Sequence, residues 1–423
     1  MSATALAGSD TPAPLRWRYG VKTADWTITV LVFLGGFVIV EPAPYDLMLV
    51  GALGVWAFFG LKFNRYTLPM TMLLLLYLAG GFLSFTQLDA FTKPTTYMVT
   101  TGFLIASSVF FAAVIIEDPA RRLALIRNAY LASAVVVSVI AILAYFNAIP
   151  HADYFKLYDR AKGTFQDPNV FGPFLVLPAA FLVRDILTRR LRESLWEIVF
   201  FLIILFAILL SFSRAAWGLV AFAAIAVAFL AFINEPRQLV RFRLIAYVLA
   251  GGAAITMLLA VAISIPQISD LYVQRAHVVQ DYDESREGRF ERQAQGFFLM
   301  QEKPLGLGPF EFGKHFGEDE HNMWLKGFTA YGWLGGFAYI ILAVWTLAAA
   351  APLLFKPRPW QPIVQGTYAV FLGHLFIHNV IDSDHWRHLF LMYGILWGAI
   401  AAEKMMARQR RRAPVGRATE AAT

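Results

Sequence analysis

Apolar residues are gathered along this chain into long runs, which short polar segments separate. The runs have about the 17 to 25 residues that an α-helix needs to cross a bilayer core of about 30 Å. No internal repeat relates them. The pattern predicts an all-α fold, that of a polytopic membrane protein with about twelve transmembrane helices. The predicted spans are residues 24–40, 45–61, 68–86, 94–116, 123–146, 169–187, 195–212, 215–233, 244–265, 323–350, 361–381 and 386–402.

Composition agrees with this fold class, because only 15% of the 423 residues are charged, against roughly 25% in soluble domains. The segment before the first run is too polar for a cleavable signal peptide, so that run is predicted to be an uncleaved span. Cysteine is absent, which excludes disulfide bonds and thiol chemistry. We expect an N-terminal tail (1–23), a transmembrane domain (24–402) and a basic C-terminal tail (403–423).

Basic residues set the expected orientation. A net charge of +7 would suggest a nucleic-acid partner in a soluble protein, but here lysine and arginine gather in alternate short connections and in the C-terminal tail. Such residues are retained on the cytoplasmic side of a membrane. Both termini are therefore expected in the cytoplasm, with membrane lipid and not nucleic acid as the partner of these charges. The basic connections lie near residues 62–65, 121–127, 184–192, 237–243 and 356–358.

One connection, residues 266–322, is far longer than the others and lies on the outer face in this topology. Long connections on a compact scaffold are often functional. Its segment "GFFLMQEKPLGLGPFEFG" (296–313) is too apolar for a disordered chain, so we expect a small helical cap. All eight histidines fall on the outer side as well, which makes this side the expected place of any titratable chemistry.

Arginines on the outer side are the first candidates for binding an anion. Arg214, in "LSFSRAAWG", lies between the seventh and eighth spans, where a guanidinium is costly unless it is used; a snorkelling arginine is the structural alternative. Arg286, Arg289 and Arg292 lie in the long loop, and the last two share a helix face unless they belong to a salt-bridged surface. Because arginine matches phosphate oxygens bidentately, these residues predict a phosphate site.

His321 and Asn322 close the long loop just before an apolar stretch, and Asn322 is a candidate substrate-binding residue. Imidazole titrates near neutral pH, so His321 is a candidate general base for a hydroxyl group. The adjacent acids, Glu318, Asp319 and Glu320, would raise its pKa or orient the ring. A purely structural histidine is the alternative.

The earlier outer loop contributes "YDRAKGTFQDPNVFGPF" (158–174). Arg160 and Lys162 add positive charge there and are candidate substrate-binding residues. Asp167 and Asn169 are candidates too, although a turn that caps the sixth span explains either of them.

A metal site is a further alternative. His374, His378 and Asp382 recur at four-residue spacing, followed by Asp384 and His385. Two histidines and a carboxylate suit a transition metal, whereas a polar cavity lining needs none. The second acid-x-acid pair on the outer side is Asp281 with Asp283.

Four segments taken together resemble the superfamily of bacterial O-antigen ligases and polymerases. They are "GTFQDPNVFG", "SFSRAAWG", "GRFERQAQGFFLMQEKPLGLGPFEFG" and "EHNMWLKGFTAYGWLGG", in this order along the chain. The resemblance implies about twelve spans with a large periplasmic loop, in the bacterial inner membrane. By motif, Arg214 and Arg289 would contact a diphosphate, and His321 would be the essential histidine.

The resemblance also implies the chemistry. Members transfer a glycan from undecaprenyl diphosphate to an acceptor, by inverting chemistry without a metal or other cofactor, on the periplasmic side. Ligases of lipopolysaccharide biosynthesis use the lipid A core as acceptor, and polymerases of O-antigen or exopolysaccharide use a carrier-linked glycan. The motifs do not separate the two, and we favour the ligase.

Two readings from other classes stay open. A twelve-span transporter or lipid flippase would carry charges near the membrane midplane, but the spans hold few such charges and the longest loop lies outside. A structural scaffold would depend on none of the candidate side chains.

Overall fold

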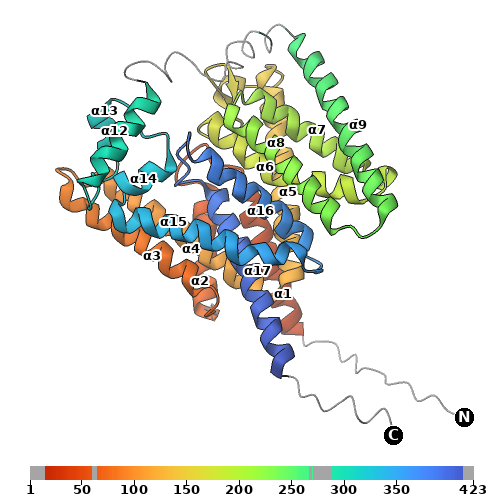
Figure 1. The fold of residues 1–423 in the computed structure, drawn as a ribbon, viewed down its shortest axis with the longest axis horizontal. Helices are drawn as coiled ribbons and strands as arrows, with labels where there is room; N and C mark the ends of the chain where they lie inside the picture. The colour runs from red at the N-terminus through yellow and green to blue at the C-terminus, as the bar shows by residue number, and fades with distance from the viewer. Residues whose placement is uncertain (1–14, 60–63, 266–268, 270–287, 413–423) are drawn as a thin grey trace, which may run out of the picture.

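The computed structural model describes residues 15–59, 64–265, 269 and 288–412, and its helices form one broad bundle, in which the beginning of the first described helix and the end of the last one lie on the same side (Figure 1). The long helices are α1 (Leu15–Leu34), α2 (Pro44–Phe59), α3 (Leu68–Leu83), α4 (Thr92–Glu117), α5 (Pro119–Tyr145), α6 (Pro168–Thr188), α7 (Leu195–Leu210), α8 (Arg214–Asn234), α9 (Gln238–Ile263), α15 (Gly332–Ala350), α16 (Gln361–Ile377) and α17 (Arg387–Arg412).

Short elements fill the connections. The helices α12 (Arg289–Gln301), α13 (Glu311–Phe316) and α14 (Met323–Thr329) form a cap on one side of the bundle (Figure 1). The 3-10 turns are η1 (Ser84–Gln87), η2 (Ala152–Phe155), η3 (Leu191–Glu193) and η4 (Ala351–Phe355). A two-stranded antiparallel ribbon joins β1 (Lys156–Leu157) and β2 (Arg160–Ala161), with Leu157 opposite Arg160.

The protein is an all-α, multi-pass membrane protein. Among the described residues, eight helices are long and apolar enough to cross a membrane, and α2 and α7 are shorter apolar helices. A helix occupies most of each predicted span, but the total of twelve spans stays a prediction. The largest departures beyond the predicted limits are at α1, which begins at Leu15, and at α17, which continues to Arg412. Charged residues can continue a helix beyond the apolar run that marks a span.

The predicted span 323–350 is wrong as a single helix. The structure divides it into α14 and α15 at Ala330 and Tyr331. Gly332 follows with a φ of +63°, a left-handed conformation that glycine adopts without a steric penalty. The carbonyl of Thr329 accepts the backbone N–H groups of Leu307 and Gly308, at 2.7 and 3.0 Å. The short helix α14 thus belongs to the cap, and α15 alone is the membrane helix.

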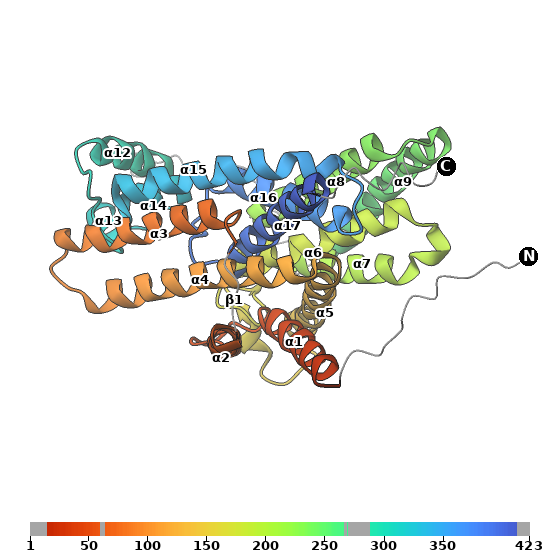
Figure 2. The same cartoon turned by 90° about the horizontal axis from the view of Figure 1, so that it is seen from below.

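Helix α17 lies near the middle of the bundle (Figure 2). A Cβ on Gly394 would lie 2.7 Å from Cβ of Phe111, so the glycine brings α17 close to α4. On another side, the indole N–H of Trp397 donates to the hydroxyl of Thr346 on α15, at 2.9 Å. Because lipid offers no hydrogen bonds, polar groups at this depth need such partners within the protein. This core fixes the position of α17 among the other helices.

The helices α3 and α15 cross without room for a side chain between them. A Cβ on Gly80 would lie 2.3 Å from the carbonyl oxygen of Tyr331 and 2.6 Å from the backbone nitrogen of Gly335. Both atoms belong to backbone that cannot move alone. The crossing therefore sets the position of Tyr331, the last residue before α15.

Replacement of Gly80 by alanine should destabilise the protein by about 1–3 kcal/mol, because overpacking forces the backbone apart. The measurement is the midpoint of thermal unfolding of the purified protein in detergent. Gly54→Ala is the matched control, since nothing lies within 4 Å of a Cβ at that exposed position of α2. Equal midpoints for the two variants would contradict the close crossing.

The cap has a small apolar core of its own, as predicted for the long loop. It is built from Met300, Leu307, Phe312 and Leu325, which are all buried. The indole N–H of Trp333, in α15, donates to the carbonyl of Met300 at 2.8 Å and ties this core to the membrane helices. Within the described part of residues 266–322, the structure has the short helices α12 and α13, while the place of this loop relative to the membrane stays a prediction.

Candidate functional site

His321 lies exposed on the cap, at the start of α14. Its φ is +46°, a left-handed conformation that is uncommon for a residue with a side chain. Its backbone N–H donates to Oδ2 of Asp382 at 3.3 Å, and that of Asn322 donates to Oδ1 at 2.9 Å. The loop between α16 and α17 therefore holds the backbone of His321 while its ring faces the surroundings.

Asn322 is buried, and its side chain serves the fold. Its Oδ1 accepts the backbone N–H of Leu325 at 3.0 Å and caps α14. Its Nδ2 donates to the carbonyl of Asn379 at 3.3 Å and to Oε1 of Gln293 at 3.4 Å. These contacts give the predicted substrate-binding residue a role in joining α14 to α16 and α12.

Gln293 connects His321 to the arginines of the long loop. From α12, its Nε2 donates to the carbonyls of Glu320 and His321, at 3.0 and 3.2 Å. Arg289 lies four residues earlier on the same helix, and residues four apart share a face. The structure thus places Arg289 on the same face of α12 as Gln293, which donates a hydrogen bond to the backbone of His321. Sequence reasoning missed Gln293, although its position one turn after Arg289 was a usable signal.

Arg289 and Arg292 differ in their surroundings. Arg289 is the first residue of α12, half-buried, and its guanidinium lies 5.1 Å from the centre of the Phe290 ring. Arg292 forms an ion pair with Glu318. Because the first turn of a helix carries partial positive charge, Arg289 stands where an anion is favoured. Arg286, the third predicted arginine of this loop, lies outside the described residues.

A buried cluster of charges around Lys326 holds Asp382, the residue that binds the backbone of His321 and Asn322. Nζ of Lys326 lies 3.3 Å from Asp382, 3.8 Å from Glu320 and 4.0 Å from Asp384. Asp384 also accepts hydrogen bonds from the hydroxyl groups of Tyr97 and Tyr331. The cluster ties the cap to α4 and to the loop before α17.

Burial and charge act against each other in this cluster. Burial raises the pKa of Glu320 to about 7, although the ammonium of Lys326 acts to lower it. Burial would lower the pKa of Lys326, but Asp382, Asp384 and Glu320 outweigh it and hold that pKa well above its usual value. The lysine is therefore a permanent cation. It was missed in the sequence, where it is the one charge of "NMWLKGF".

Arg214 is the first residue of α8, and it is half-buried. Ser213 caps the helix by accepting the backbone N–H of Ala216 at 3.4 Å. A Cβ on Gly172 of α6 would lie 2.6 Å from Cβ of Ala216, so the first turn of α8 packs tightly on α6. The position of Arg214 is thereby fixed by two helices.

The other candidates of the earlier outer loop mainly hold that loop in place. Arg160 is buried, with Nε donating to the carbonyl of Ser211 and Nη2 to Oδ1 of Asn169, both at 2.8 Å. Asp167 caps α6 by accepting the backbone N–H of Asn169 at 2.6 Å. The ammonium of Lys162 lies 5.6 Å from the centre of the Tyr154 ring.

Helix α16 lies between the two groups of candidates. Its side toward α8 is set by Gly373, where a Cβ would lie 2.5 Å from Cδ1 of Leu219. At its C-terminal end, the carbonyl of His378 accepts the backbone N–H of Met323 at 2.7 Å. The structure thus arranges α8, with Arg214, and the cap, with His321, around the C-terminal end of one helix (Figure 1).

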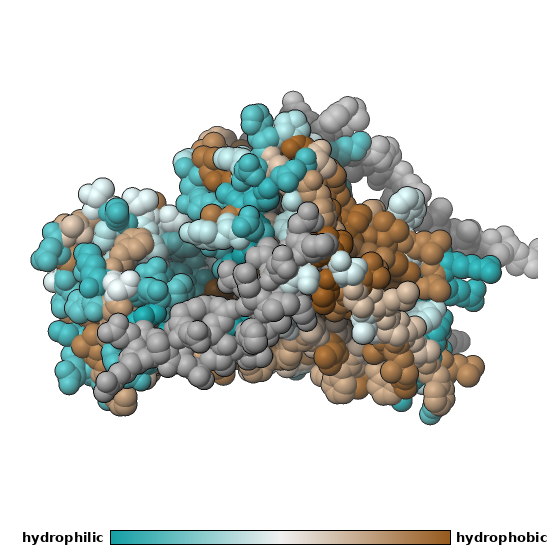
Figure 3. Space-filling model, turned by 90° about the horizontal axis from the view of Figure 1, so that it is seen from above, coloured by the Kyte–Doolittle hydropathy of each residue, from teal (hydrophilic) through white to brown (hydrophobic). Residues whose placement is uncertain are grey.

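The face that carries the cap has two chemical characters (Figure 3). Hydrophilic residues gather on the left and in the centre of this view, over the cap and the loops beside it, while apolar surface dominates on the right. Exposed apolar residues of α9, such as Leu249, Met257 and Val261, agree with a lipid-facing helix.

The residues that suggested a metal site as an alternative have other partners. Nε2 of His374 lies 3.3 Å from Nε2 of His388, while Asp382 binds the backbone of the cap. In the part of the chain that the structure describes, no three His, Asp or Glu side chains are arranged to hold an ion. Asp281 and Asp283 lie outside that part.

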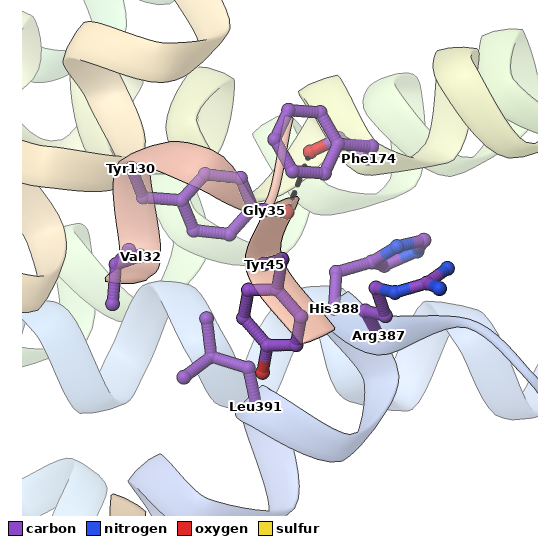
Figure 4. Close-up of a pocket in the computed structure, with 8 residues that line it drawn as sticks. All are labelled: Val32, Gly35, Tyr45, Tyr130, Phe174, Arg387, His388 and Leu391. Atoms are coloured by element: carbon purple, nitrogen blue, oxygen red, sulfur yellow. Dashed lines mark hydrogen bonds between the residues drawn. The ribbon is translucent and has the colours of Figure 1, made fainter. Parts of the chain in front are cut away.

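A small cavity lies among α1, α2, α5, α6 and α17 (Figure 4). Its free volume is about 20 Å³, room for one water molecule. Arg387 at its edge pairs with Asp46, at 2.7 Å, and with Glu41, at 3.2 Å. The cavity is therefore too small for a glycan, and its cation already has carboxylate partners.

Residues 199–340 match the family model described as O-antigen ligase. No curated protein matches the chain. The matched segment runs from α7 to α15 and contains Arg214, Arg289, Arg292 and His321, whereas Arg160 and the other candidates of the earlier loop lie before it.

Proposed function

Because the chain belongs to the superfamily of O-antigen ligases and polymerases, we propose that it transfers a glycan from undecaprenyl diphosphate to the lipid A core. The family makes it a membrane glycan transferase with a lipid-linked donor. The ligase activity, the inner-membrane location and the periplasmic position of the cap are parts of this proposal.

One observation carries the proposal: Gln293 joins the backbone of His321 to α12, the helix that begins with Arg289. An exposed imidazole and a guanidinium are thereby held on one surface, above helices that cross the membrane. A donor anchored by its lipid tail would present its diphosphate at this height. The arrangement suits a reaction between a lipid-linked diphosphate and a hydroxyl group.

The proposed reaction is a single displacement at the anomeric carbon of the donor glycan. The hydroxyl oxygen of the acceptor attacks this carbon, and the bond from the carbon to the phosphate oxygen breaks. The leaving undecaprenyl diphosphate keeps the electron pair, and Arg214 and Arg289 stabilise its charge. His321 takes the proton of the hydroxyl and then releases it to water. Attack opposite the leaving group inverts the anomeric configuration.

This chemistry draws on the protein's own side chains. A diphosphate is a good leaving group once cations neutralise it, so the step needs no nucleotide and no acid. Cations fixed in advance in a poorly hydrated site stabilise developing charge more than water does. The half-buried settings of Arg214 and Arg289 support this role.

Lipopolysaccharide from a strain that lacks this gene tests the function. We expect an intact lipid A core without long glycan, while glycan accumulates on its lipid carrier. A strain complemented with the wild-type gene is the control. A core capped by a single repeat would identify a polymerase instead, and unchanged lipopolysaccharide would contradict the proposed acceptor.

A further inference from the structure

The proposed reaction assigns no step to Lys326, although this lysine contacts Asp382, which binds the backbone of His321. We infer that Lys326 is a positioning residue for His321, because its ammonium holds the Asp382 carboxylate that binds the backbone of His321 and Asn322. This inference rests on the proposed function of His321.

The ammonium of Lys326 lies among carboxylates from two segments of the chain. Nζ of Lys326 lies within 4.0 Å of three carboxylates, those of Glu320, Asp382 and Asp384. These acids come from two segments, the end of the cap loop and the loop between α16 and α17. Their side chains are 6–16% exposed, so the repulsion among them is poorly screened by water. A cation in their midst allows the two segments to stay together.

The backbone conformation of His321 depends on its contact with Asp382. Two successive backbone N–H groups, those of His321 and Asn322, point at one carboxylate, and such pairs of N–H groups form a concave anion site. The left-handed φ of His321 is part of this arrangement. If Asp382 moved away, His321 would lose the contact that offsets its unfavourable backbone conformation, and its imidazole would change direction.

The burial of Lys326 excludes direct binding of the substrate by its ammonium. The side chain of Lys326 is only 13% exposed, and its ammonium is surrounded by carboxylates. A donor diphosphate would have to displace these acids to reach it. Lys326 therefore acts through Asp382 and not by binding substrate.

The test compares Lys326→Met with Lys326→Arg in proteoliposomes that contain a lipid-linked glycan donor and lipid A core. A misplacement of about 1 Å costs about 10²-fold in rate, so Lys326→Met should lose about that factor in kcat with little change in the KM of the donor. Lys326→Arg keeps the cation and should recover most of the rate. Lys314→Met is the matched control, since Lys314 is an exposed lysine of α13 that pairs with Glu311 at 2.6 Å.

Three results would overturn the inference: an unchanged kcat in Lys326→Met, a rise in the donor KM alone, or equal losses in the Met and Arg variants. If Lys326→Met does not fold, Asp382→Asn takes its place in the test. It should likewise lower kcat with little change in the KM of the donor, and an unchanged kcat would overturn the inference. The wild-type reaction separates this inference from the proposed function. Without wild-type transfer the function fails, whereas wild-type transfer with a fully active Lys326→Met ends the positioning role alone.

Discussion

Replacement of His321 by alanine should lower the rate of glycan transfer by about 10²- to 10⁴-fold, the usual contribution of a general base. The acceptor hydroxyl would still be bound, but no side chain would take its proton during the attack. Donor binding should be unchanged, because the arginines that meet the diphosphate remain. The measurement is single-turnover transfer by purified protein in proteoliposomes, with bound donor determined in parallel.

His315→Ala is the matched control for this variant. His315 is an exposed histidine of the same cap, and its Nδ1 lies 3.0 Å from the carbonyl oxygen of Glu311. It should transfer glycan at the wild-type rate. If His321→Ala kept that rate as well, the imidazole would have no part in the reaction.

Replacement of Arg214 by glutamine should lower kcat/KM by about 10²- to 10³-fold, as the loss of one preorganised donor to a developing anion does. Arg214→Lys should fall between this variant and the wild type, because lysine keeps the charge but not the planar fork that matches phosphate oxygens. Unreacted lipid-linked donor should accumulate in cells that carry the glutamine variant. The measurement is the initial rate as a function of donor concentration.

Arg192→Gln serves as the control, since Arg192 is an exposed arginine of η3 at the other end of α7 from Arg214. It removes the same charge from the chain without touching the candidate site. Equal activity of Arg214→Gln and Arg192→Gln would mean that Arg214 is only an anchor at the membrane boundary.

The helical core was predictable from the sequence because one signal, the apolar run, decides it. Helices stand at the predicted spans, and the apolar stretch 296–313 indicated the packed cap that α12 and α13 provide. The division of 323–350 was not predictable in this way. Residues on both sides of the break are apolar, so hydropathy continues through it. The turn depends on the conformation of Gly332 and on backbone hydrogen bonds to residues 307 and 308.

The candidate site was predictable only as single residues. Motif and charge pointed to Arg214, Arg289 and His321, but the contact between His321 and Asp382 joins residues 61 apart in the chain. No local pattern encodes such a pairing. For the same reason Asp382 was grouped with His374 and His378 by helical spacing.

Some candidates have structural partners that a sequence does not reveal. Arg160 was chosen for its charge, and Asn322 for its place beside His321. Arg160 anchors the earlier outer loop on Ser211 and Asn169, and Asn322 caps α14. A buried polar side chain needs hydrogen-bond partners within the fold, and the same residue types bind ligands when they are exposed. Burial separates the two cases, and it becomes visible only in three dimensions.

The proposed function requires that the protein alone transfers a glycan from a lipid diphosphate. Reconstitution measures this transfer directly. Purified protein in proteoliposomes would receive undecaprenyl-diphosphate-linked glycan and lipid A core, with product glycolipid and released undecaprenyl diphosphate both quantified. We expect equal amounts of the two products from the wild type, and about 10²- to 10⁴-fold slower formation of both with His321→Ala. Donor that crosses the bilayer with the bond between its glycan and the diphosphate unbroken, in either protein, would contradict a transferase and indicate a transporter.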